Sequence, residues 1–83
     1  MPISNCLDRY LAFLQRGERR PCREIAAEAL AAMPEPSHIY EQLLWPAMTR
    51  IEALYRDDRI NTATERMATR INRTIADQMQ MHL

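Results

Sequence analysis

The segment between Tyr40 and Tyr55 has the most regular pattern in the chain, because an apolar residue recurs there at every third or fourth position. The residues of this stripe are Tyr40, Leu43, Leu44, Ala47, Met48, Ile51, Leu54 and Tyr55. Steps of three and four place side chains on one face of a helix, whereas a strand alternates at every second position. The pattern therefore predicts an amphipathic helix over residues 37–55.

Two helices are expected before this one. The first begins near the N-terminus and stops at Gly17, since glycine accepts the left-handed conformation that commonly follows a helix. The second is expected to begin at Pro21, because a proline at the first helical position loses no hydrogen bond. Pro34 and Pro36 then end it, since a residue that precedes proline avoids helical angles.

A fourth helix follows a polar break at residues 56–59. Asn61 or Thr62 is placed to cap it through a side-chain oxygen, and its apolar residues continue at helical spacing towards Met79. A connection this short makes the third and fourth helices antiparallel neighbours. The sequence predicts one all-α domain over residues 1–83, a four-helix antiparallel bundle.

Composition narrows the environment and the partners. The chain of 83 residues carries 11 basic residues, all of them arginine, and 11 acidic ones, so its net charge is zero. Cys6 and Cys22 are expected to be free thiols, because the chain lacks a signal peptide and the expected helices hold the two far apart. No apolar run approaches the roughly 20 residues that span a bilayer. We expect a cytoplasmic protein without membrane contact.

The sequence offers little for catalysis or metal binding. His38 and His82 are distant from each other and have no Cys, Asp or Glu at metal-ligand spacing. A glycine-rich phosphate loop is also missing. Neither catalytic nor metal-binding residues are assigned, and we expect the chain not to be an enzyme.

Three arginines, Arg66, Arg70 and Arg73, are spaced along one side of the fourth helix. Such a stripe is usually a solvated face, and no aromatic residue alternates with it to stack on bases. Nucleic-acid contact through this helix is the alternative, and a steep salt dependence would reveal it. The solvated face is the preferred interpretation.

Three motifs give the chain a resemblance to a known family. They are Leu-Leu-Trp-Pro-Ala-Met at residues 43–48, Ile-Glu-Ala-Leu-Tyr at residues 51–55, and Arg-Ile-Asn-Thr-Ala-Thr-Glu-Arg-Met-Ala at residues 59–68. This pattern resembles the helical cap module of cobalamin-binding proteins, found in methionine synthase, corrinoid methyltransferase subunits and light-sensing MerR-type regulators. The closest pattern is that of the light-sensing regulators, in which a Trp is followed, after nine intervening residues, by Glu-His. Here Tyr55 stands for the Trp, and Glu65 and Arg66 stand for the Glu-His pair.

The resemblance implies a function shared between two domains. The helical cap covers the upper face of a corrinoid, adenosylcobalamin or methylcobalamin, and an α/β domain with an Asp-x-His-x-x-Gly motif supplies the lower ligand. This sequence holds only the cap, so it is not expected to retain the cofactor alone, and we expect a longer protein or a separate α/β partner. A sensor, a regulator or a corrinoid carrier would each fit. The alternative is a cofactor-free helical module for interaction or dimerisation.

The resemblance implies cofactor contacts for Tyr55, Glu65 and Arg66, and each has a structural alternative. Tyr55 also continues the apolar stripe and could pack at the end of the bundle. Glu65 also fits a capping box that begins at Thr62, in which a carboxylate bonds the amide of the capping residue. Arg66 could form a surface ion pair, and it cannot coordinate cobalt because guanidinium offers only donors.

Two neighbouring residues in the third helix carry expectations of their own. Pro46 lies in mid-helix, where it removes the backbone bond to Gln42 and should kink the helix. Trp45 falls off the main apolar stripe. It either packs on the first two helices or marks an exposed contact patch, and the sequence leaves both open.

Overall fold

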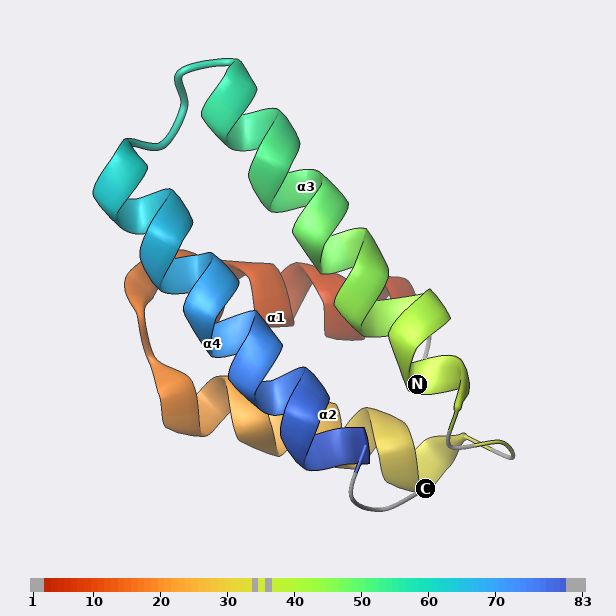
Figure 1. Ribbon diagram of the computed structural model, residues 1–83. Coiled ribbons are helices and arrows are strands. Elements are labelled where there is room, and N and C mark those ends of the chain that lie inside the picture. The colour runs from red at the N-terminus through yellow and green to blue at the C-terminus, as the bar shows by residue number, and fades with distance from the viewer. Residues whose placement is uncertain (1–2, 34, 36, 81–83) are drawn as a thin grey trace.

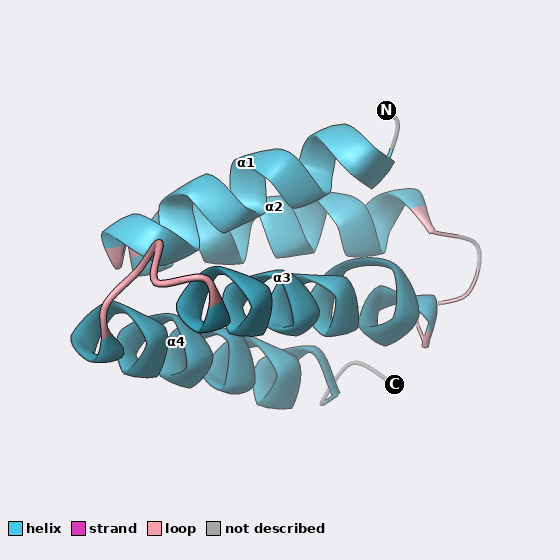
Figure 2. Ribbon diagram, turned by 90° about the horizontal axis from the view of Figure 1, so that it is seen from above, coloured by secondary structure: helices cyan, strands magenta, loops and turns pink. Residues whose placement is uncertain are grey.

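The computed structural model describes residues 3–33, 35 and 37–80. Within them the elements are α1 (Ile3–Arg16), α2 (Arg19–Ala32), the π-helical turn η1 (Tyr40–Leu44), α3 (Trp45–Arg56) and α4 (Thr62–Gln80). Helices α1 and α2 form one antiparallel hairpin, α3 and α4 form another, and the two hairpins pack face to face (Figure 1, Figure 2). The described residues contain no strand. The predicted all-α, four-helix antiparallel bundle is confirmed.

Gly17 ends α1 as the sequence predicts. Its φ is +73°, in the left-handed region that favours glycine. The N–H of Gly17 donates to the carbonyl of Leu14 at 3.1 Å, and the N–H of Glu18 donates to the carbonyl of Phe13 at 3.1 Å. These two bonds form a Schellman motif, which satisfies the last carbonyls of the helix and turns the chain back.

The start of α2 differs from the expectation. The helix begins at Arg19, so Pro21 occupies its third position and not its first. The first three N–H groups of a helix have no partner inside it, so proline loses no bond at any of these positions. The backbone bond from Cys22 to the carbonyl of Glu18, at 3.4 Å, follows the proline directly. Pro34 and Pro36 lie outside the described residues.

The third predicted helix is divided by a π-helical turn just before its proline. In η1 the N–H of Trp45 donates to the carbonyl of Tyr40, five residues earlier, and α3 then starts at Trp45 with Pro46 in its first turn. Widening the helix by one residue is a common way to accommodate a position where the regular ladder is broken. A π-turn therefore directly precedes Pro46, and the predicted kink of the helix stays a prediction.

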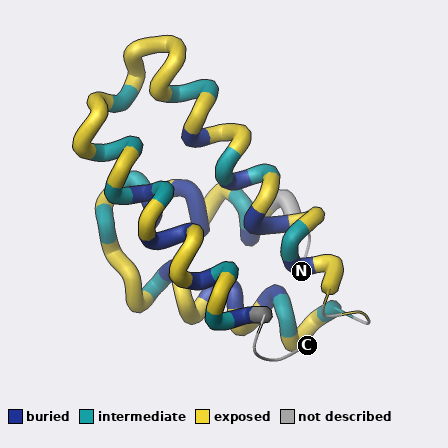
Figure 3. The backbone as a smooth tube through the Cα atoms, viewed as in Figure 1, coloured by how far each residue is buried: buried dark blue, intermediate teal, exposed yellow. Residues whose placement is uncertain are grey.

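The core lies between the two hairpins, and Figure 3 shows buried positions recurring between exposed ones along the helices. Among the described side chains, Asn72 is the one buried polar group, with 3% of its surface exposed. The Tyr10 hydroxyl donates to Oδ1 of Asn72 at 2.6 Å, and Nδ2 of Asn72 donates to the carbonyl of Leu44 at 3.2 Å. One amide thus connects α1, α4 and η1, and it fixes the distances between them.

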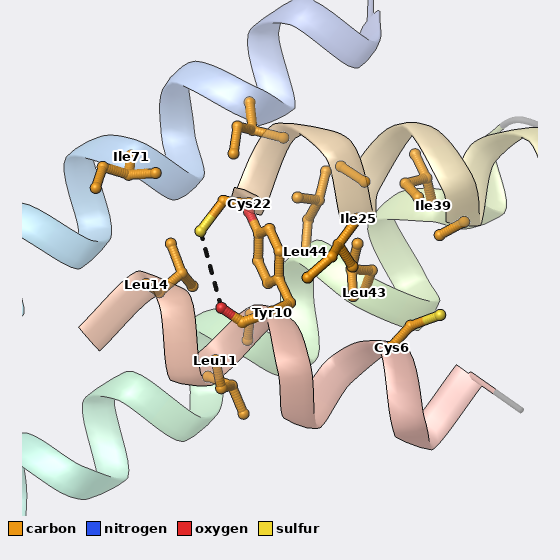
Figure 4. Packing of buried hydrophobic residues seen from close by; sticks show 14 of the residues in the cluster. Cys6, Tyr10, Leu11, Leu14, Cys22, Ile25, Ile39, Leu43, Leu44 and Ile71 are labelled. Atoms are coloured by element: carbon orange, nitrogen blue, oxygen red, sulfur yellow. Dashed lines mark hydrogen bonds between the residues drawn. The ribbon is translucent and has the colours of Figure 1, made fainter. Parts of the chain in front are cut away.

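Both cysteines are buried thiols outside any disulfide, as predicted. Figure 4 shows Cys22 beside Tyr10, whose carbonyl accepts a hydrogen bond from the Cys22 thiol at 3.9 Å, whereas Cys6 lies towards the other end of α1. Burial, and secondarily the negative charge of Glu18, raises the pKa of Cys22 to about 11. Burial also raises the pKa of the Tyr10 hydroxyl, with a smaller contribution from Cys22. Both groups are neutral at physiological pH.

Candidate functional site

Helix α3 ends and α4 begins at one tip of the molecule, at the top of Figure 1. Asp58 makes the reversal with a φ of +59°, a left-handed conformation in a residue other than glycine. Its N–H donates to the carbonyl of Tyr55 at 3.1 Å, and the N–H of Arg59 donates to the carbonyl of Leu54 at 2.9 Å. A second Schellman motif therefore brings α4 back beside α3.

Tyr55 lies in the last turn of α3, and 41% of its surface is exposed. Its hydroxyl is 3.0 Å from the hydroxyl oxygen of Thr62, the first residue of α4. The ring is therefore outside the core, although it continues the apolar stripe in the sequence. A hydroxyl held at one end and an exposed aromatic face suit a contact with a flat apolar surface.

Glu65 does not take part in the expected capping box. The N-cap is Asn61, whose Oδ1 accepts the N–H of Thr64 at 2.8 Å, so Glu65 comes one position too late to reach back to the cap. Its carboxylate instead accepts a hydrogen bond from the Thr69 hydroxyl at 3.3 Å, and the residue is half-buried. This bond orients the carboxylate along α4 and leaves its other oxygen available.

Arg66 is exposed, and among the described residues no ion pair involves it. Together with Glu65 it lines an open groove of about 320 Å³ along the outer side of α4, which continues past Arg70 and Arg73 to Asp77. The arginine stripe predicted from the sequence is therefore exposed as expected. A guanidinium without a protein partner can donate to an amide or a phosphate.

The three residues singled out in the sequence lie at the same end of the α3–α4 pair. Glu65 and Arg66 share one groove, whereas Tyr55 is outside it and stands at the end of the neighbouring helix. The link between the two parts is Thr62, which bonds Tyr55 and opens α4. The arrangement combines an aromatic face, a hydrogen-bond acceptor and a cationic donor.

Two threonines that orient these residues were missed in the sequence analysis. Thr69 follows Glu65 by four residues, the spacing at which side chains meet on a helix surface, so this pair had a recognisable signal. The bond between Thr62 and Tyr55 crosses a turn whose geometry depends on Asp58, and no periodic pattern announces it.

Of the two alternatives for Trp45, packing on the first two helices or exposure on a contact patch, the structure favours exposure. With 72% of its surface exposed it is the most exposed large apolar residue of the described chain, and the groove that it lines has no wall residue from α1 or α2. Met48, which belongs to the predicted apolar stripe, is half-buried, and so is Met67, which packs against the core.

Metal ligands do not gather in the part of the chain that the structure covers: no group of three His, Cys, Asp or Glu side chains is placed to hold an ion there. His38 is exposed in the short helical segment that leads into η1. His82, the other histidine noted in the sequence, lies outside the described residues.

The helical fold and the tip on α3 and α4 describe a small cap domain that presents one aromatic residue and two charged ones. A family model for the B12 binding domain matches residues 6–79, nearly the whole chain. The chain therefore belongs to this family and is a helical cap domain of the cobalamin-binding type. In the family, such a cap normally pairs with a Rossmann-like B12 domain.

Searches of curated proteins and of solved structures gave no match to this chain. Across residues 3–33, 35 and 37–80, the structure has no helix that combines the length and the apolar character needed to cross a membrane.

Proposed function

We propose that this chain covers the upper face of a corrinoid whose lower face is held by a Rossmann-like B12 domain, in the same protein or in a partner. Tyr55, Glu65 and Arg66 would face the upper ligand. The observation that carries the proposal is the exposure of Tyr55, an aromatic residue held by Thr62 at the tip and left out of the core. By the sequence resemblance, Tyr55 stands where light-sensing regulators of the cap family have a Trp.

The three side chains suit the surface of a cobalamin. A corrin is a broad, nearly flat macrocycle with amide-bearing side chains, and bound cobalamin supplies a cobalt–carbon bond at its upper face. The Tyr55 ring offers a flat apolar contact of matching character. The free carboxylate oxygen of Glu65 accepts hydrogen bonds and the Arg66 guanidinium donates them. The pair can therefore bind both the N–H and the carbonyl of amide groups.

Arg66 separates this chain from the light-sensing pattern. A guanidinium stays charged at any physiological pH and has no lone pair to offer a metal, so it cannot replace a neutral imidazole as a cobalt ligand. Arg66 is therefore proposed to bind the periphery of the corrinoid or its upper ligand. A regulator that senses the presence of the cofactor, or a corrinoid carrier, fits this better than a photoreceptor that depends on the histidine.

The chain is proposed to act as a binding module without a reaction of its own. Because the tip is an open surface, the cap can contribute only part of the binding free energy, and the second domain must supply the rest. Adenosylcobalamin and methylcobalamin differ in the size of the upper ligand. The relative affinity of the complex for the two therefore indicates how much space lies beneath Tyr55.

The test is a titration of adenosylcobalamin and methylcobalamin into an equimolar mixture of this chain and a Rossmann-like B12 domain, followed by absorbance and by co-elution. We expect the chain to co-elute with the corrinoid-loaded domain and to change its spectrum. If the chain stays separate from the loaded domain and neither spectrum changes, the proposal is wrong. The same domain titrated without the chain is the control.

A further inference from the structure

A small depression lies between α2 and α4, which run beside each other in the bundle (Figure 1). It has a volume of about 130 Å³, and its lining residues are Arg19 and Arg23 from α2 and Ile71, Thr74, Ile75 and Gln78 from α4. The depression shares no residue with the proposed corrinoid contact, since Tyr55, Glu65 and Arg66 do not line it. Its chemistry therefore calls for a separate account.

Two arginines on α2 give the depression its charge. Arg19 and Arg23 are one helical turn apart, so they are neighbours on the helix surface. Both are exposed, and among the described residues neither has an ion-pair partner. The positions three and four residues before and after each of them hold no Asp or Glu. Two like charges at this spacing repel each other, and an anion bound between them relieves the repulsion.

The carboxylates closest to the two arginines in the chain do not line the depression. Glu18 forms an ion pair at 3.8 Å with Arg16, at the end of α1. Glu24 directly follows the second arginine, and adjacent residues of a helix point to different sides. On α4, Asp77 lines the neighbouring groove on the outer side of the helix. The described lining residues therefore carry two positive charges and no negative one.

The remaining polar groups add an uncharged donor and a favourable field. Gln78 is half-buried, and its side-chain amide makes no hydrogen bond among the described residues, so its N–H groups are available. The Thr74 hydroxyl already donates to the carbonyl of Arg70 at 2.9 Å, so it forms a wall and not a donor. Helix α2 begins at Arg19 with no acidic residue in its first turn, so the positive end of its dipole also favours an anion here.

The floor and the size of the depression limit what it can hold. Ile71 and Ile75 are 2% and 3% exposed, so they belong to the core and form an apolar base. Such a base lowers the local dielectric and strengthens charge-assisted hydrogen bonds above it. A volume of 130 Å³ corresponds to about four water molecules at roughly 30 Å³ each. A single group with a few oxygen atoms fits this space.

We propose that the depression between α2 and α4 binds a phosphate group, held by Arg19 and Arg23 with Gln78 as a further donor. A phosphate monoester carries nearly two negative charges at neutral pH, which matches the two guanidinium groups. Its oxygens can accept from a planar guanidinium in pairs and still serve the amide, whereas a carboxylate has only two oxygens for all three donors. The ligand is inorganic phosphate or the phosphate end of an organic monoester.

Titration of the chain with sodium phosphate, followed by nuclear magnetic resonance of the amide groups, tests the proposal. We expect saturable shifts at the start of α2 and at the side-chain amide of Gln78, with a dissociation constant of about 1 mM or lower. Sodium chloride at the same ionic strength is the control and should not produce these shifts. A wild-type chain without saturable shifts up to about 20 mM phosphate overturns the proposal.

Single substitutions separate a built site from general attraction by positive charge. Arg19→Gln and Arg23→Gln should each raise the dissociation constant for phosphate at least about tenfold, because each removes a charge-assisted donor. Arg50→Gln removes an exposed arginine from α3, which does not line the depression, and is the matched control. All three residues are exposed, so the variants should fold normally, which circular dichroism checks. If Arg50→Gln weakens binding as much as the other two, the proposed site is wrong.

Phenyl phosphate distinguishes the two sources of the phosphate group. Tighter binding of phenyl phosphate than of inorganic phosphate assigns the site to an organic monoester, whereas equal affinity assigns it to free phosphate. If phenyl phosphate binds Arg19→Gln/Arg23→Gln as tightly as the wild type, the ring and not the phosphate is recognised, and the proposal is wrong. None of these measurements uses a corrinoid, so their outcome does not depend on the proposed function.

Discussion

The hydroxyl of Tyr10 donates a 2.6 Å hydrogen bond to Oδ1 of Asn72, and this bond joins α1 to α4 across 62 residues of sequence. The amide of Asn72 continues the connection to the carbonyl of Leu44, at the end of the π-helical turn. All buried side-chain polar atoms in the described residues have partners. A fully paired network inside an apolar core favours one arrangement of the helices, because any shift leaves a buried polar group unpaired.

Tyr10→Phe is expected to lower the free energy of unfolding by about 1–3 kcal/mol, because Oδ1 of Asn72 then stays buried without a donor. Tyr40→Phe is the matched control: it removes a 2.9 Å bond from a half-buried hydroxyl to a helix carbonyl, and about 0.5–1 kcal/mol should be lost. Urea unfolding at neutral pH measures both. Equal losses in the two variants would show that the Asn72 network has no special role.

The sequence predicts the helices well because their apolar stripes are regular, and Tyr10 lies on such a stripe. It does not reveal Asn72, because an asparagine in a helix is normally solvated and only the packed bundle shows that this one is buried. The sequence likewise does not predict the π-turn before Pro46. A proline predicts that the ladder is interrupted, but the neighbouring helices decide whether the chain bends or widens.

Gly17→Ala should destabilise the protein by about 1–2 kcal/mol from the left-handed backbone alone. A second cost arises because a Cβ at this position would collide with the sulfur of Met67. The double variant Gly17→Ala/Met67→Ala relieves the collision but not the backbone strain. We therefore expect a coupling of about 0.5–1 kcal/mol in a double-mutant cycle, and additive losses would contradict the contact.

Asp58→Gly should stabilise the protein, by up to about 1 kcal/mol. Asp58 holds a φ of +59°, which glycine adopts without strain, and its negative charge lies at the C-terminal end of α3, where an anion is unfavourable. Asp57 has a φ of −87°, so Asp57→Gly gains nothing from the backbone and serves as control. Thermal unfolding of both variants and of Asp58→Asn separates the backbone effect from the charge effect.

Stability should fall in alkaline solution because of Cys22. Burial raises the pKa of its thiol from 9.0 to about 11, so between these values the unfolded chain loses the proton while the folded chain keeps it. The free energy of unfolding therefore declines from pH 9 to about pH 11, by at most about 1.4 kcal/mol per pH unit for one such group. The raised pKa of Tyr10 acts in the same direction from pH 10.

The chain is suitable for this measurement because it contains no lysine, the residue that normally titrates in this range. Urea unfolding at pH 8, 9, 10 and 11 gives the slope, and Cys22→Ala should reduce it between pH 9 and 10. An unchanged slope in Cys22→Ala would assign the alkaline loss to another group.

The sequence predicted which two helices meet at the tip, but it did not predict the hydrogen bonds between the residues there. Antiparallel pairing of α3 and α4 follows from the short connection, and this alone brings Tyr55, Glu65 and Arg66 to one end. The capping-box interpretation of Glu65 was wrong by one position, because Asn61 competes successfully with Thr62 for the cap and shifts the register. The sequence did not decide whether Tyr55 and Trp45 are exposed, because an apolar stripe does not show at which residue the core ends.

The proposed corrinoid contact predicts a graded response at position 55. Tyr55→Ala removes the aromatic face and should weaken binding to the corrinoid-loaded Rossmann-like domain by about tenfold, equivalent to about 1.4 kcal/mol, whereas Tyr55→Phe keeps the face and should change affinity less than threefold. Tyr55→Trp enlarges the face and should bind at least as tightly. Isothermal titration of each variant into the Rossmann-like domain loaded with adenosylcobalamin measures the affinities of the series.

Arg66→Ala should also weaken this binding, by about threefold to tenfold, because a charge-assisted donor to the periphery of the corrinoid is lost. Arg20→Ala removes an exposed arginine from α2, in the other hairpin, and should leave the affinity unchanged. Arg66→Lys retains the charge but loses the planar donor pair, so its affinity should lie between wild type and Arg66→Ala. If Arg66→Ala and Arg20→Ala bind alike, Arg66 belongs to the solvated stripe of α4 and has no part in the cap.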